Sequence, residues 1–227
     1  MSTYEPFVEI YDVWYPLTED VPFYVELARE ADGPVVELAV GTGRLAVPVA
    51  EALGRKLIGT DLSPGMLAQA RKRAAAAGVE LELREEDMRD FELDEPAALV
   101  YCPARALLHL PTWADKRRVF ERVAASLRPG GRFAWNAFVF DPAIATRVSG
   151  HNEEPVPHTV TQAPHESRVD IELDTGGRIS LWWATGNEWL GLIDAAGLEL
   201  EALYGDFERS PFDEESREFV FVTRKPE

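Results

Sequence analysis

The sequence has little cysteine, no long apolar run and few basic residues beside its many acidic ones. A single cysteine, Cys102, excludes an internal disulfide framework. The longest apolar stretches, such as residues 133–140, are far shorter than the roughly 20 residues that a membrane-spanning helix needs. Residues 1–6 lack the basic start and apolar run of a secretory signal. These absences lead us to expect a cytoplasmic protein with no membrane partner.

Acidic residues outnumber basic ones, and the formal net charge is −17. A nucleic acid is bound by clustered Lys and Arg, which would have to act here against a strongly negative field. The densest basic runs, residues 71–73 and 116–118, fall on expected amphipathic helices, and we interpret both as solvated outer faces. We therefore expect a small-molecule partner and no nucleic acid.

The first two thirds of the chain alternate between strand and helix patterns, which is typical of a parallel sheet with helices on both faces. With 227 residues, 46% of them hydrophobic, the chain is long enough for one sizeable core. Strands are expected at residues 35–39, 56–60, 79–84, 97–101 and 132–139. Helices are expected at residues 43–53, 64–77 and 113–127. A turn at residues 128–131, Arg-Pro-Gly-Gly, separates the last of these helices from the fifth strand.

The alternation stops after Asp141. Residues 151–164 show no periodicity and are interpreted as a loop, whereas residues 166–173 and 178–183 alternate on either side of a Gly-containing turn and predict a hairpin. A helix at 187–196 and strands at 198–204 and 218–223 complete the chain. We therefore expect a single domain, 1–227, built from a helical cap, a cofactor-binding core, a small antiparallel β excursion over the substrate site, and a last helix with strands. The corresponding ranges are 1–33, 34–140, 141–184 and 185–227.

A glycine turn lies between the first strand and the first helix of the core. Gly41 and Gly43 carry no side chain there, so the backbone can approach a ligand closely. Glu37 stands at the end of the strand, directly before the turn. A glycine pair of this kind also occurs in ordinary turns, so the acids around it decide the interpretation.

Acidic residues follow the next two strands as well. Asp61, at the end of the second strand, can accept hydrogen bonds from both ribose hydroxyls of an adenosine. Asp87 follows the third strand and suits the adenine amino group, with Met88 beside the ring. Together with Glu37 these acids would repel a pyrophosphate and favour an adenosine with a cationic tail. The alternative is that the acids only cap helices and strands.

Five segments resemble the motifs of class I S-adenosylmethionine-dependent methyltransferases, namely residues 36–45, 61–63, 86–88, 101–110 and 127–131. The resemblance covers residues 11–139 strongly, and the chain is similar to small-molecule members such as glycine N-methyltransferase and aminosugar N,N-dimethyltransferases. It implies an α/β, Rossmann-like doubly wound sheet of about seven strands with the last strand antiparallel. It also implies S-adenosyl-L-methionine as cofactor and S-adenosyl-L-homocysteine as product.

The resemblance assigns a set of cofactor-binding residues. At Ala39 the family usually has glycine, and we expect binding to tolerate the extra methyl group. Arg44 either pairs with the methionine carboxylate or points to solvent. The full set is Tyr11, Glu37, Ala39, Gly41, Gly43, Arg44, Asp61, Leu62, Met66, Asp87, Met88 and Tyr101.

Methyl transfer requires the acceptor, the methyl group and the sulfur to be held in line, and a base helps when the acceptor must lose a proton. His109 follows the fourth strand at the carboxyl edge of the sheet and is the candidate base, with structural packing as the alternative. Tyr11 is the second candidate, because an N-terminal tyrosine lies near the methyl group in family members. Aromatic anchoring of the N-terminal helix is its alternative.

Other chemistries are less favoured by the sequence. His151, His158 and His165 recur at seven-residue spacing, but no zinc spacing is met, so no metal is expected. Trp182, Trp183 and Trp189, another recurrent group, are expected in the core or in the wall of the substrate pocket.

Three functions remain open. They are a methyltransferase acting on a small molecule, with nitrogen favoured over oxygen, an inactive S-adenosylmethionine- or nucleotide-binding protein, and an NAD-dependent oxidoreductase. The sequence is compatible with a homodimer but does not require one.

Overall fold

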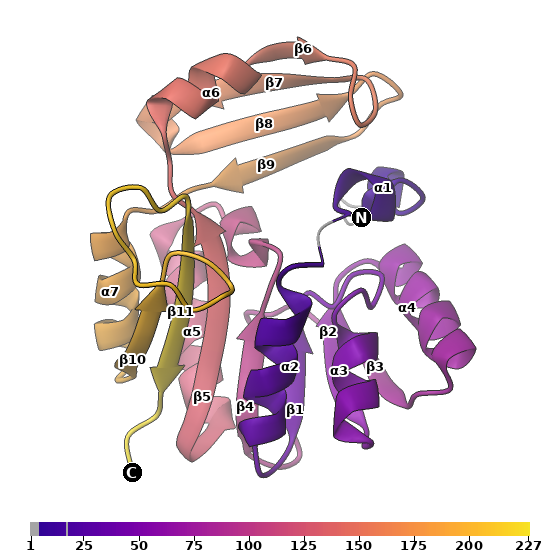
Figure 1. Ribbon diagram of the computed structural model, residues 1–227, viewed down its shortest axis with the longest axis vertical. Coiled ribbons are helices and arrows are strands. Elements are labelled where there is room, and N and C mark those ends of the chain that lie inside the picture. Colours follow the sequence, from indigo (N-terminus) through magenta and orange to yellow (C-terminus); the bar gives the residue numbers. More distant parts are fainter. Residues whose placement is uncertain (1–4, 17) are drawn as a thin grey trace.

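The central sheet is seven-stranded, in the order β10-β11-β5-β4-β1-β2-β3 (Figure 1). The computed structural model describes residues 5–16 and 18–227. Most of residues 1–6, in which no secretory signal was found, therefore lies outside the described residues. Strands β1 to β5 run parallel, and β11 runs antiparallel to both of its neighbours. This confirms the expected fold class. The bounds are β1 Val35–Leu38, β2 Leu57–Asp61, β3 Leu81–Glu85, β4 Ala97–Cys102, β5 Leu127–Phe138, β10 Glu199–Tyr204 and β11 Glu218–Arg224.

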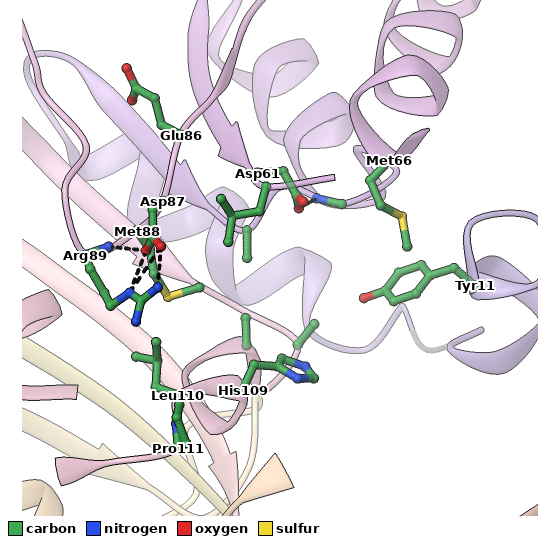
Figure 2. A pocket seen from close by; sticks show the side chains of 15 residues that line it. Tyr11, Asp61, Met66, Glu86, Asp87, Met88, Arg89, His109, Leu110 and Pro111 are labelled. Carbon is green, nitrogen blue, oxygen red and sulfur yellow. Dashed lines mark hydrogen bonds and ion pairs between the residues drawn. The ribbon is translucent and has the colours of Figure 1, made fainter. Parts of the chain in front are cut away.

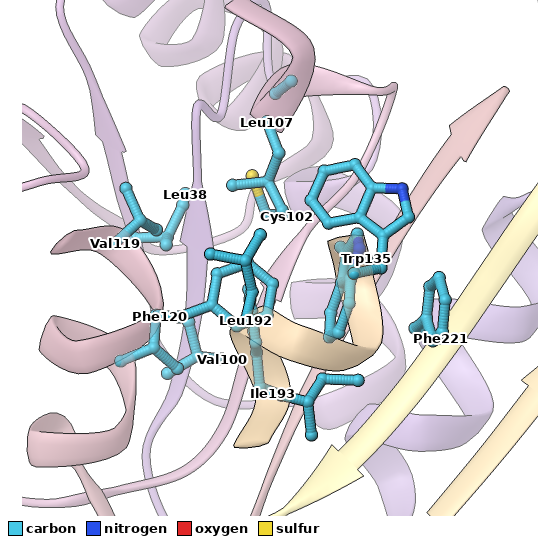
Figure 3. Close-up of a cluster of buried hydrophobic side chains, with 14 of the residues drawn as sticks. Leu38, Val100, Cys102, Leu107, Val119, Phe120, Trp135, Leu192, Ile193 and Phe221 are labelled. Atoms are coloured by element: carbon cyan, nitrogen blue, oxygen red, sulfur yellow. The ribbon is translucent and has the colours of Figure 1, made fainter. Parts of the chain in front are cut away.

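Helices cover both faces of this sheet because successive strand residues point to opposite sides. In β1, Val36 and Leu38 pack into one core cluster while Val35 packs into the other. The first cluster lies under α5 and α7, and Figure 3 shows Trp135 and Phe221 among its side chains. The second lies under α2 and α3. The helices are α2 Val21–Glu30, α3 Ala46–Leu53, α4 Pro64–Ala77, α5 Trp113–Ser126 and α7 Gly186–Ala195.

The helix expected at residues 64–77 is present as α4, and its capped start borders the predicted site. The Ser63 hydroxyl accepts a hydrogen bond from the Met66 backbone N–H, Pro64 stands at the first helical position, and Gly78 ends the helix with a φ of 71°. The expected strand at 79–84 is displaced to Leu81–Glu85. In the described part of the chain, no helix is long and apolar enough to cross a membrane.

We expected a turn at residues 128–131 to precede the fifth strand. This strand boundary is wrong, because β5 runs through these residues. The pairing of β4 with β5 shifts between Ala97↔Leu127 and Leu99↔Arg132, so the Pro-Gly-Gly residues form an irregularity inside the strand. A Cβ on Gly131 would lie 2.9 Å from the Ala97 carbonyl oxygen, so only glycine fits this close approach.

A second sheet, β6-β7-β8-β9, is antiparallel and lies above the carboxyl edge of the first (Figure 1). The predicted hairpin is present as β8 and β9, and the excursion also contains a helix, α6, that the sequence analysis did not predict. The loop expected at 151–164 is wrong, because β6 and β7 occupy much of it. β7 forms because six of its residues pair in register with β8, a long-range constraint that its own residues do not reveal. The bounds are α6 Pro142–Val148, β6 Gly150–Asn152, β7 His158–Ala163, β8 Arg168–Leu173 and β9 Arg178–Trp182.

The N-terminal segment lies between the two sheets, with a 3-10 helix η1 (Glu5–Phe7) and a short helix α1 (Tyr11–Trp14). Phe7 is buried with side chains of β8 and β9. The Trp14 indole meets the His158 ring edge to face, with the ring centres 4.6 Å apart. The segment therefore joins the small sheet to the cofactor-binding core.

Candidate cofactor and active site

A cavity of about 300 Å³ opens at the carboxyl ends of β1, β2 and β4, where ligands bind in open α/β sheets. Figure 2 shows its lining. The structure brings nine of the predicted residues together there: Tyr11, Ala39, Gly41, Asp61, Leu62, Met66, Asp87, Met88 and His109. Six further residues line the cavity and were not predicted as site residues: Glu86, Arg89, Ala104, Ala106, Leu110 and Pro111. Four predicted residues do not line the cavity, namely Glu37, Gly43, Arg44 and Tyr101.

The turn after β1 takes a left-handed backbone at three positions. Ala39, Gly41 and Gly43 have φ values of 54°, 54° and 76°. Glycine adopts this backbone without strain, so the glycine that the resemblance leads us to expect at Ala39 has a conformational reason. A Cβ on Gly43 would lie 3.2 Å from that of Ala70, so Gly43 lets α4 pack against the turn.

Asp61 ties the end of β2 to this turn. One carboxylate oxygen accepts a hydrogen bond from the Gly41 backbone N–H at 2.9 Å, and the other accepts one from the Ser63 N–H at 2.8 Å. Burial raises the pKa of Asp61, and these backbone hydrogen bonds act against the rise. The carboxylate also lines the cavity, and each of its oxygens can accept further hydrogen bonds.

Glu37 lies beneath the turn and is almost fully buried, with 2% of its surface exposed. The Tyr101 hydroxyl donates a hydrogen bond to its carboxylate at 2.6 Å. Burial raises the pKa of Glu37 to about 8, and the Tyr101 hydrogen bond only partly offsets this. Tyr101 itself stacks on Tyr24 in the core. The structure thus places Tyr101 as the support of Glu37 and away from the cavity.

Arg44 does not point to solvent, the second of its two predicted arrangements, because it pairs with an acid inside the protein. Its two terminal nitrogens donate hydrogen bonds to the two carboxylate oxygens of Asp20 at 2.7 and 2.6 Å. Asp20 is buried, and the Arg44 guanidinium also lies over the Tyr15 ring at 5.1 Å. This ion pair joins the glycine turn to the start of α2.

Asp87 is held by an arginine two residues further along the chain. The Arg89 side chain donates to both oxygens of Asp87 and reaches Asp115 at 2.8 Å, as the dashed lines in Figure 2 show for Asp87. These hydrogen bonds lower the pKa of Asp87. The Asp-x-Arg spacing was the signal in the sequence that would have placed Arg89 in the site.

His109 and Tyr11 form facing parts of the cavity wall (Figure 2). His109 ends the 3-10 helix η2 (Ala106–His109), and burial lowers its pKa to about 4. The backbone of Ser180 in β9 acts against this shift by hydrogen bonding, and the charge of Lys116 adds to it. Burial raises the pKa of Tyr11. Both side chains are therefore neutral near pH 7.

We interpreted the basic run at residues 116–118 as a solvated face, and this is wrong for Lys116, which is buried. Only 4% of its surface is exposed, and its Nζ donates a hydrogen bond to the Leu110 carbonyl oxygen at 2.6 Å. Burial lowers the pKa of Lys116 to about 8. Its neighbours Arg117 and Arg118 are exposed and form ion pairs with Glu121 and Asp90.

The three tryptophans and three histidines that recur in the sequence do not line the cavity. Trp189 is fully buried in the core, while Trp183 stacks on Phe140 with ring centres 4.3 Å apart. Among the residues that the structure describes, no group of three or more His, Cys, Asp or Glu side chains could hold a metal ion.

The part of the chain that forms most of this cavity matches a known protein family. Residues 35–131, which run from β1 into β5, match the family model described as a methyltransferase domain. This part of the chain is a methyltransferase domain. It contributes the glycine turn, Asp61, Asp87 and His109 to the cavity.

Two curated relatives show how far the similarity extends. The demethylmenaquinone methyltransferase of Thermus thermophilus is 34% identical over 110 residues, which cover 48% of this chain and 49% of the relative. The dTDP-4-amino-2,3,4,6-tetradeoxy-D-glucose N,N-dimethyltransferase of Saccharopolyspora spinosa is 26% identical over 241 residues, with 88% and 93% covered. The chain spans about half the length of the first relative and of most others that it matches.

Solved structures match nearly the whole chain. The CcbJ methyltransferase of Streptomyces caelestis is 26% identical with a TM-score of 0.78, covering 92% of this chain and 91% of that one. An S-adenosylmethionine-dependent methyltransferase of Clostridium acetobutylicum shares the fold at 14% identity, with a TM-score of 0.82 and 100% of both chains covered. The resemblance inferred from the motifs is thus confirmed, and the shared fold extends over the β excursion and the last strands.

Proposed function

We propose that this chain is an S-adenosylmethionine-dependent methyltransferase that methylates a small molecule, with nitrogen as the acceptor atom. The proposal rests on one observation: Gly41, Asp61, Met88 and Tyr11 line the same cavity. These residues come from four separate segments and were each assigned to the cofactor from motifs alone.

The donors and acceptors at this edge fit S-adenosylmethionine better than a dinucleotide. A Rossmann site for a pyrophosphate needs backbone N–H groups free at the glycine turn, whereas the Gly41 N–H here donates to Asp61. Asp61 would accept the ribose hydroxyls, and Met88 would lie against the adenine. Glu37, which lies beneath the glycine turn and does not line the cavity, would attract the methionine ammonium through its charge when it is ionised. The bound cofactor supplies a methyl group on a sulfonium, which needs no metal or nucleophilic side chain.

The protein's part in the reaction is to orient the acceptor and exclude water. Tyr11 covers the cavity from the N-terminal segment, and the small sheet lies above it. A group with a pKa of about 4 is a weak base at neutral pH, so we propose that His109 orients the acceptor rather than taking its proton.

Support for nitrogen comes from the relative in Saccharopolyspora spinosa, whose name specifies N,N-dimethylation and which aligns with 88% of this chain. The acidic lining adds to this, since Asp61, Glu86 and Asp87 favour an amine over an anionic oxygen nucleophile.

Calorimetry with S-adenosylhomocysteine and with NAD tests the cofactor. We expect dissociation constants in the micromolar range, about −8 kcal/mol, for S-adenosylhomocysteine and no binding of NAD. The reverse result would contradict the proposal.

A panel of amines, sugars and phenols then tests transfer to nitrogen. Each is assayed for release of S-adenosylhomocysteine, and the product is analysed by mass spectrometry. Cofactor binding without transfer to any member would favour the inactive binding protein instead.

A further inference from the structure

Three segments cover the edge of the sheet at which the cavity opens. They are residues 5–16 with 18–20, residues 141–184 with the small sheet, and the loop 205–217 (Figure 1). The loop is held there by a hydrogen bond from the Val139 backbone N–H to the Arg217 carbonyl oxygen at 3.0 Å. An acceptor must therefore pass these segments to reach the cavity.

All three segments are acidic. Residues 5–20 hold five Asp or Glu and no Lys or Arg. Residues 141–184 hold seven acids against three arginines, and residues 205–217 hold five acids against two arginines. A negative rim of this kind raises the local concentration of cations and lowers that of anions.

Most arginines of the rim are already paired within the protein. A guanidinium that binds a phosphate does so through a bidentate, charge-assisted contact, so an arginine held by a carboxylate is not available for one. Four of the five rim arginines form such ion pairs: Arg168 with Asp170, Arg178 with Asp170, Arg209 with Glu26, and Arg217 with Asp141.

The same holds for the arginines deeper in the site. Arg105, directly after the cavity residue Ala104, donates from its Nε and Nη2 to the carboxylate of Glu218. Asn136 donates to the same carboxylate at 2.6 Å. The cavity residue Arg89 is held by Asp87 and Asp115, as Arg44 is held by Asp20.

We propose that the acceptor is an amine that is cationic at neutral pH and carries no phosphate. The amine loses one proton to solvent before transfer, and the lone pair of the neutral nitrogen then takes the methyl group as the bond from that group to the sulfur breaks. This deepens the proposed function and rests on it. The relative in Saccharopolyspora spinosa is named for a dTDP-linked amino sugar. A diphosphate of that kind would enter this site against a negative rim, and four of the five rim arginines could bind it only by giving up a carboxylate. A free amine would instead be attracted to the rim.

Calorimetry on the protein saturated with S-adenosylhomocysteine tests the exclusion of phosphate. Inorganic pyrophosphate and dTDP are titrated up to about 10 mM, a range that detects binding as weak as about −3 kcal/mol. We expect no saturable binding of either, and saturable binding of one of them would overturn the proposal. Failure of S-adenosylhomocysteine itself to bind would contradict the proposed function instead, so the two failures are distinguishable.

The salt dependence of transfer tests the charge of the acceptor. For each acceptor found in the panel, kcat/KM is measured from about 20 to about 300 mM NaCl, over which screening shortens the reach of the rim's field. We expect kcat/KM to fall, and by less in the double variant Glu153→Lys/Glu154→Lys, which reverses two exposed rim charges. The matched control, Asp32→Lys/Glu51→Lys, reverses two exposed charges away from the rim. A rise of kcat/KM with salt would overturn the proposal.

Discussion

At the scale of single residues, the candidate site depends on buried groups whose charge the surrounding protein sets. Glu37 is neutral at pH 6 because burial raises its pKa to about 8. His109 is neutral for the opposite reason, since burial lowers its pKa to about 4. A cationic ligand therefore changes the protonation of Glu37 and leaves that of His109 unaffected near pH 7.

Affinity for S-adenosylhomocysteine is expected to rise with pH from about 6 to about 8 and then to level off. The ligand's ammonium favours the ionised form of Glu37, so binding below about pH 8 releases a proton and becomes up to tenfold tighter per pH unit. Calorimetry across this range measures the trend. Glu37→Gln should bind more weakly at pH 8 and lose the dependence, while the exposed Glu85→Gln should keep it. A flat profile in the unsubstituted protein would contradict the assignment of Glu37.

Ala39→Gly is expected to stabilise the protein. Ala39 has a φ of 54°, which costs an alanine about 1–2 kcal/mol, whereas the loss of backbone freedom on folding costs a glycine about 0.5–1 kcal/mol. The free energy of unfolding in urea should rise by about 0.5–1 kcal/mol, with binding of S-adenosylhomocysteine retained. The control Ala75→Gly, at an exposed helical position, should lose about 1 kcal/mol. Equal losses in both variants would contradict this account.

Lys116→Met is expected to raise the pKa of His109. The ammonium of Lys116 lies close enough to disfavour protonation of the imidazole, and Asp115 and Glu188 are the acids that act on Lys116. NMR titration of the histidine ring protons measures the shift. The variant should also weaken S-adenosylhomocysteine binding, because the Leu110 carbonyl in the cavity wall loses its donor. Arg117→Met, next to it on the exposed face, should change neither quantity.

At the scale of elements, the N-terminal segment is attached to the core at two points on either side of Tyr11. Glu5 accepts hydrogen bonds from the Ser63 hydroxyl at 2.6 Å and from the Gly65 N–H at 3.2 Å. Asp12 accepts one from the Thr42 hydroxyl at 2.8 Å and pairs with Arg73. These attachments hold the segment that carries Tyr11 against the core.

Asp12→Ala is expected to speed release of S-adenosylhomocysteine. Exposed ion pairs contribute about 0.2–1 kcal/mol, so the dissociation rate should rise by about two- to fivefold while the association rate changes little. Stopped-flow fluorescence measures both rates. Glu9→Ala, on the same segment and exposed, is the control. An unchanged dissociation rate would mean that this attachment does not limit release.

At the scale of the whole molecule, the net charge of −17 destabilises the folded state through self-repulsion. The melting temperature is therefore expected to rise by several degrees between about 20 and about 300 mM NaCl, because screening weakens repulsion between distant charges. Differential scanning calorimetry measures it, with sucrose at equal osmolarity as control. A melting temperature that falls with salt would mean that the surface ion pairs outweigh the repulsion.

Features that depend on neighbours in the chain could be predicted from the sequence. The order of strands and helices, the cap at Ser63 and the glycine turn follow from periodicity and local backbone requirements. Asp61 and Asp87 could be placed at the cavity because the carboxyl ends of parallel strands share one edge of a sheet.

Only the tertiary structure decided which groups these residues meet. Arg44 is held by Asp20, Glu37 by Tyr101 and Lys116 by the Leu110 carbonyl. β7 likewise exists through its pairing with β8. Each of these contacts depends on how the elements pack together. Packing sets the burial of a side chain and hence its charge, and it supplies the partner that a strand such as β7 needs. A local sequence pattern does not encode that packing.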